Sequence, residues 1–121
     1  MNTTLATRIA AITGFLAVAL GAFGAHGLKA TLELNGTLAV WQTGALYHLV
    51  HAVMLFIVAQ RATVARLPFT LFAAGILVFS GSLYALAITN VKILGAITPI
   101  GGLCLLGGWL VLAFPNRSAT Q

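Results

Sequence analysis

Two histidines and a tyrosine give the segment 41–60 acid–base side chains within a long apolar stretch. His48 and His51 are three residues apart, and Tyr47 and His51 are four apart, so a helix places each pair on one face. Histidine changes its charge near neutral pH and can pass protons or bind metals. The pattern is therefore typical of a proton relay, a polar path or a metal site.

Polar side chains from two later segments are expected at a similar depth in a membrane. With a rise of ~1.5 Å per residue, His48 and Ser82 each lie ~13 Å inside their helices, counted from the same side. Ser80 lies a little deeper, and Tyr84 and Thr98 lie nearer the surface. We expect Ser80, Ser82 and Tyr84 to be neighbours of His51, the stronger candidate of the two histidines.

This polar cluster has two interpretations. Its members can be interhelical hydrogen bonds that hold the helices together, each contributing ~0.6 kcal/mol on average. Alternatively, ionisable side chains inside a membrane often mark an ion or substrate pathway. The sequence leaves both interpretations open.

A metal or haem site is a weaker hypothesis. His26, His48, His51 and Cys104 are suitable ligand types. However, His26 falls at the end of its helix, ~6–10 Å by helix rise from the level of His48. Two histidines on one face of one helix also cannot hold a haem from opposite sides. We therefore expect no metal and no cofactor, and we place His26 outside the cluster.

Enzymatic chemistry is not expected, because the sequence lacks the acids that it requires. Glu33 is the sole acidic residue and lies outside the long apolar stretches. A carboxylate pair and a Ser-His-Asp triad are therefore both absent.

The composition indicates a membrane protein. Of the 121 residues, 60% are hydrophobic and only 6% are charged, whereas about a quarter of the residues in a soluble domain are charged. The charged residues separate four uncharged runs, each at least as long as the ~20 residues that cross a membrane. These runs are 9–28, 34–60, 67–91 and 93–116.

We predict a single transmembrane domain, 1–121, that is an all-α, compact four-helix bundle. Pro68 suits the first turn of the third helix, and Pro99 is expected to kink the fourth helix or to break off a short first turn. Small residues of the first helix form a stripe suited to close packing. The expected helices are 8–26, 39–60, 68–89 and 93–114, with an interfacial loop or short helix at 27–38.

The basic residues predict that both termini are cytoplasmic, because four of them fall on one side of the membrane and two on the other. The first group is Arg8, Arg61, Arg66 and Arg117, and the second is Lys29 and Lys92. The net charge of +5 comes from these scattered residues, so it does not indicate nucleic-acid binding, which needs a contiguous basic patch. Cys104 is the only cysteine, which excludes an intramolecular disulfide and leaves its redox role open.

Three stretches carry a resemblance to a known family: 21–26, with Gly21, Gly24 and His26; 47–51 in the second helix; and 79–84 followed by 98–102. Together they resemble the family of small bacterial inner-membrane proteins called DUF423 or UPF0382, which has a eukaryotic relative called transmembrane protein 256. The resemblance covers nearly the whole chain and implies a four-helix protein of the inner membrane. It implies no activity, substrate or cofactor. The remaining motif residues are Gly81, Pro99, Gly101 and Gly102.

We expect a structural or accessory membrane protein that acts through lipid or membrane-protein partners, or as a small homo-oligomer. The alternative is a small proton or polar-solute conduit that uses the cluster of the second and third helices. A metal- or haem-binding protein is the third and weakest hypothesis.

Overall fold

Four long apolar helices make up the chain in the computed structural model, which describes residues 1–114. The spans are α1 (Thr3–Ala25), α3 (Leu38–Ala59), the continuous run of α4 and α5 (Arg66–Thr89), and the run Lys92–Ala113, which contains α6. Each has 22 to 24 residues, or ~33–36 Å at ~1.5 Å per residue, which suffices to cross a hydrocarbon core of ~30 Å. The predicted all-α, four-helix fold is confirmed.

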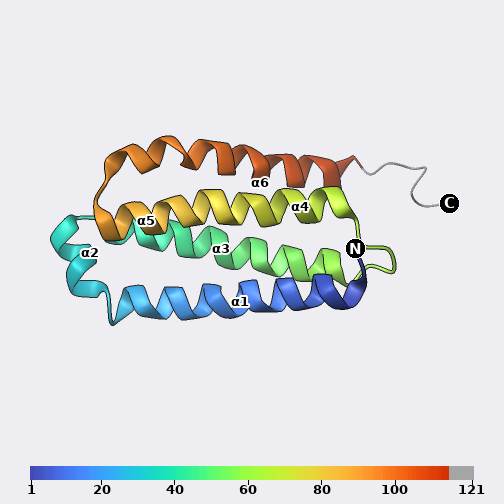
Figure 1. Ribbon diagram of the computed structural model, residues 1–121, viewed down its shortest axis with the longest axis horizontal. Helices are drawn as coiled ribbons and strands as arrows, with labels where there is room; N and C mark the ends of the chain where they lie inside the picture. Colours follow the sequence, from blue (N-terminus) through green and yellow to red (C-terminus); the bar gives the residue numbers. More distant parts are fainter. Residues whose placement is uncertain (115–121) are drawn as a thin grey trace.

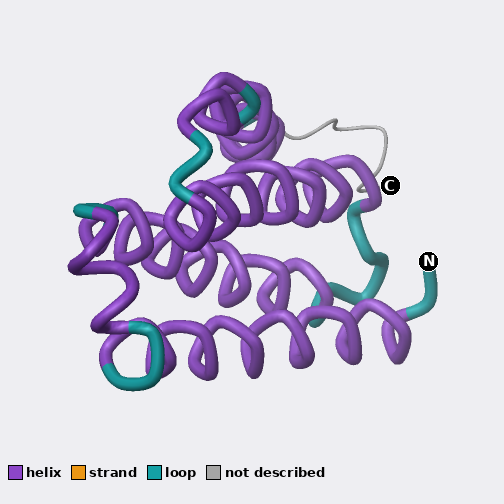
Figure 2. The backbone as a smooth tube through the Cα atoms, turned by 60° about the vertical axis from the view of Figure 1, so that its left-hand side comes forward, coloured by secondary structure: helices purple, strands orange, loops and turns teal. Residues whose placement is uncertain are grey.

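The four spans lie side by side in the order α1, α3, α4–α5, α6 (Figures 1 and 2). The start of α1 and the end of α6 lie at one end of the bundle, and the short helix α2 (Lys29–Asn35) lies at the other (Figure 1). The two central spans bury more of their residues than α1 or α6. The bundle is therefore a row with two edge helices.

The helix boundaries differ from the predicted ones at their starts. The first helix begins at Thr3 rather than at residue 8, because the Asn2 side chain caps it by accepting a hydrogen bond of 2.7 Å from the Leu5 N–H. The third begins at Arg66, with Pro68 in its first turn. The fourth begins as a 3-10 helix, Lys92–Ala96, and α6 (Thr98–Ala113) follows with Pro99 in its first turn. The expected stop at Pro115 and the basic residue Arg117 lie outside the described residues.

The third span contains a π-helical segment, Ile76–Ser80, between α4 (Arg66–Gly75) and α5 (Gly81–Thr89). Its wider turn was not predicted, and such turns are frequent at functional sites. The Ser80 hydroxyl of this segment donates a hydrogen bond of 2.7 Å to the Gly44 carbonyl of α3. The irregular turn thus lies against the centre of the neighbouring span.

Two groups of buried apolar side chains hold the row together. The larger group joins α1, α3, α4 and α6, and the smaller group joins α2, α3 and α5 around Trp41. At the α2 end, the Thr37 hydroxyl donates to the Ala87 carbonyl at 2.7 Å, and the Asn35 amide donates to the carbonyls of Ala87 and Ile88. These bonds fix the α2–α3 connection to the end of α5.

Candidate functional site

His48 pairs with Tyr84 across α3 and α5. Its Nδ1 atom lies 2.9 Å from the Tyr84 hydroxyl, and its side chain is buried. The backbone carbonyl of Thr13 in α1 is a second partner of the His48 ring. His48 therefore contacts the first, second and third spans at once.

His51 has different partners from those predicted. Trp109 of α6 donates its indole N–H to His51 Nε2 at 3.0 Å, and His51 Nδ1 lies 2.7 Å from the Tyr47 carbonyl. An indole nitrogen can only donate and a carbonyl can only accept, so His51 is neutral and carries its proton on Nδ1. Both ring nitrogens are thus used in hydrogen bonds within the protein.

The predicted neighbours of His51 lie elsewhere. Ser80 bonds to the Gly44 carbonyl, Tyr84 bonds to His48, and the Ser82 hydroxyl lies 2.6 Å from the Thr98 hydroxyl in the α5–α6 contact. The expected single cluster is therefore wrong in its pairing, because the three side chains leave the third span in different directions. Within residues 1–114, every fully buried side-chain nitrogen or oxygen has a hydrogen-bond partner.

The sequence prediction omitted Trp109, which closes the His51 contact. A tryptophan four residues before the end of a span is usually an interfacial anchor, so its position gave no sign of an inward role. Tyr47 was included, but its side chain is 43% exposed. Its ring lies against Phe79, with a centroid distance of 4.8 Å.

The remaining candidate ligands are dispersed. His26 caps the end of α1 and is exposed, and Cys104 is a half-buried free thiol in α6. Among the described residues, no three His, Cys, Asp or Glu side chains lie close enough together to hold a metal ion.

Two motif glycines allow close contact between spans. A Cβ atom on Gly24 would overlap the Trp41 indole, whose N–H donates to the Leu20 carbonyl of α1 at 2.9 Å. A Cβ atom on Gly101 would overlap the backbone of Phe79 in the π-helical segment. These glycines are packing residues.

The other motif glycines, Gly21, Gly81 and Gly102, face open space or ordinary contacts. The predicted stripe of α1 is likewise only partly used. Ala10 and Ala17 are buried, whereas a Cβ atom on Gly14 would meet nothing within 4 Å. The stripe therefore packs along one flank only.

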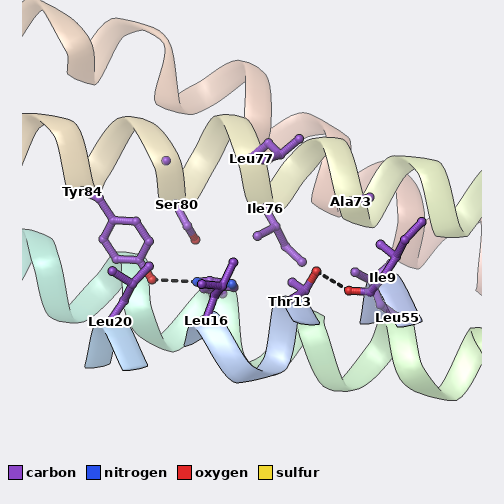
Figure 3. Close-up of a pocket in the computed structure, with 12 residues that line it drawn as sticks. Ile9, Thr13, Leu16, Leu20, Leu55, Ala73, Ile76, Leu77, Ser80 and Tyr84 are labelled. Atoms are coloured by element: carbon purple, nitrogen blue, oxygen red, sulfur yellow. Dashed lines mark hydrogen bonds between the residues drawn. The ribbon is translucent and has the colours of Figure 1, made fainter. Parts of the chain in front are cut away.

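A cavity of about 350 Å³ lies between α1, α3 and the third span (Figure 3). Its α2 end carries the polar groups, with Tyr84 and Ser80 pointing from the third span toward α1, and its other end is apolar (Figure 3). Thr13 stands between the two ends. The lining side chains are Ile9, Thr13, Leu16 and Leu20 of α1, His48 and Leu55 of α3, and Ala73, Ile76, Leu77, Ser80, Gly81 and Tyr84 of the third span.

Four apolar spans tied together by buried polar pairs define an integral membrane protein of the four-helix class. The chain belongs to the family described as protein of unknown function (DUF423), whose pattern matches residues 20–102. The expected resemblance is confirmed by named relatives. No solved structure matches the chain.

Three relatives show the breadth of the family. The UPF0382 membrane protein YwdK of Bacillus subtilis is 46% identical over 86% of this chain and 89% of its own length. A UPF0382 membrane protein of Haemophilus influenzae is 44% identical, with 88% of each chain covered. The UPF0382 membrane protein C1782.12c of Schizosaccharomyces pombe is 35% identical, over 87% of this chain and 95% of its own.

Proposed function

We propose that this protein is an accessory membrane protein that binds one lipid chain in the cavity between α1, α3 and the third span. The single observation that carries this proposal is the cavity itself, which is lined mainly by carbon and lies within the membrane-spanning helices. Hydrocarbon is the solvent around these helices, so a lipid chain is the molecule at hand to fill an apolar space there.

The dimensions of the cavity favour a single chain. Along α1 it extends from Ile9 to Leu20, which is ~16 Å at ~1.5 Å per residue. Its 350 Å³ spread over ~16 Å gives a mean cross-section of about 22 Å², the width of one extended hydrocarbon chain. The volume also lies at the lower end of the ~300–1,000 Å³ typical of small-molecule sites.

The polar pairs support an accessory role over a conduit. A proton relay through His51 would have to break the bond that Trp109 donates, because both ring nitrogens are engaged. Glu33, the only acid, is exposed on α2, so His48 and His51 have no carboxylate partner. The proposal therefore includes neither proton transport nor an enzymatic step.

The proposal also keeps the predicted orientation, with both termini in the cytoplasm, and for a bacterial cell it places the protein in the inner membrane. The Lys and Arg distribution supports the first statement. Four α-helical spans support the second, because the spanning proteins of the bacterial outer membrane are β-barrels. In a Cys104→Ala background, externally added thiol reagents should label Asn35→Cys and spare Ala62→Cys. The reverse pattern would overturn the orientation.

Native mass spectrometry of the protein released from lipid nanodiscs tests the lipid proposal. The wild-type chain should retain one lipid per protomer, and the same spectra report any homo-oligomer or bound membrane-protein partner. Gly81→Leu should abolish retention, because Gly81 lines the cavity and has no atom within 4 Å of its Cβ position. The leucine can therefore fill the cavity without displacing a neighbour.

Gly14→Leu is the matched control. Gly14 also has open space at its Cβ position, but it does not line the cavity. This variant should retain lipid like the wild type. Equal retention by the wild type and Gly81→Leu would place the lipid elsewhere and remove the proposal.

A further inference from the structure

The polar end of the cavity has a fixed hydrogen-bonding character. The Thr13 hydroxyl donates to the Ile9 carbonyl at 2.7 Å, and the Ser80 hydroxyl donates to the Gly44 carbonyl at 2.7 Å. Each proton is therefore committed to a backbone acceptor. What these two hydroxyls can still offer to a ligand is an oxygen lone pair.

The His48–Tyr84 pair follows the same rule. A neutral histidine has one donor and one acceptor nitrogen. With its N–H directed to the Thr13 carbonyl, His48 accepts at Nδ1 from the Tyr84 hydroxyl. The Tyr84 oxygen then also has only a lone pair for a ligand.

We propose that the cavity selects a neutral lipid that carries a free hydroxyl group, held between Thr13, Ser80 and Tyr84. This inference rests on the proposed lipid-binding function and specifies its ligand class. The hydroxyl donates its proton to these oxygens, and the chain runs along Ile9, Leu55 and Ile76 at the apolar end.

Other lipid head groups match this end of the cavity poorly. Carboxylates, phosphates, esters and quinone carbonyls present acceptors, which would face protein acceptors without a proton between them. An ammonium group can donate, but its charge would be buried without an acid, because the only acid of the chain is on α2. A neutral alcohol satisfies both the hydrogen bonding and the charge.

The test compares three probes of equal chain length by native mass spectrometry of delipidated wild-type protein: a long-chain alcohol, its methyl ether and the corresponding carboxylate. The alcohol should bind about tenfold more tightly than the ether, which corresponds to ~1.4 kcal/mol, and the carboxylate should bind least. Equal binding of alcohol and ether, or preference for the carboxylate, would overturn the inference and leave the lipid-binding function standing. Failure of all three probes to bind would count against both.

A pair of double variants locates the preference. Thr13→Val with Ser80→Ala removes two of the acceptors and should reduce the ratio of alcohol to ether binding, while ether binding persists. Ser82→Ala with Thr98→Val removes the same kinds of hydroxyl from the α5–α6 contact, outside the cavity, and should keep the wild-type ratio. A lowered ratio in the second double variant alone would place the alcohol outside the cavity.

Discussion

Gly101 and Gly102 are adjacent in sequence but differ in what an added methyl group would meet. A Cβ atom on Gly101 would lie 2.8 Å from the Cα atom of Phe79, whereas ordinary contacts begin at 3.4 Å. Because the obstacle is backbone, no side-chain rotation relieves it, and α6 must move by at least 0.6 Å (3.4 less 2.8). On Gly102 the nearest atom would be 3.7 Å away, in the Phe79 ring, which is an ordinary contact.

The magnitude follows from comparing Gly101→Ala with Gly102→Ala. Both substitutions add the same helix propensity to α6, ~0.8–1 kcal/mol, so this contribution cancels in the difference. What remains is the overpacking cost, ~1–3 kcal/mol, and the rigid backbone contact places it near ~3 kcal/mol. We therefore expect Gly101→Ala to lower the free energy of unfolding by ~2 kcal/mol and Gly102→Ala to raise it by ~1 kcal/mol.

Unfolding in mixed micelles, with the sodium dodecyl sulfate fraction raised stepwise and helicity followed by circular dichroism, measures this difference. Gly101→Ala should unfold at a lower detergent fraction than the wild type, and Gly102→Ala at an equal or higher one. Coincident transitions for the two variants would refute the close approach of α6 to the π-helical segment.

Two further predictions concern the other tryptophan-mediated contacts. Gly24→Ala should destabilise the protein by ~1–3 kcal/mol in the same assay, because its methyl group would overlap the buried Trp41 indole, whereas Gly21→Ala should be neutral or slightly stabilising. Trp109→Phe should cost ~0.6–1.7 kcal/mol, because it leaves His51 Nε2 without its donor, and a change in the His51 ring nitrogen chemical shifts should accompany the loss. An unchanged His51 spectrum would contradict the assigned bond.

The sequence by itself determined the class of protein and the number of spans. Seven charged residues in 121 leave four long uncharged runs, and the cost of placing a charge in hydrocarbon forces the spans to lie between them. Local signals also fixed some details. Gly36, with a φ of 69°, ends α2, and Pro99 separates the 3-10 turn from the main part of α6.

Only the tertiary structure decided which side chains meet. Each span is apolar on nearly all sides, so hydropathy does not reveal which face turns inward. The rotation of each helix is set by close contacts such as those at Gly24 and Gly101, and the π-helical segment redirects the residues that follow it. These contacts pair His51 with Trp109 and His48 with Tyr84, although helix spacing alone had placed both histidines in one cluster.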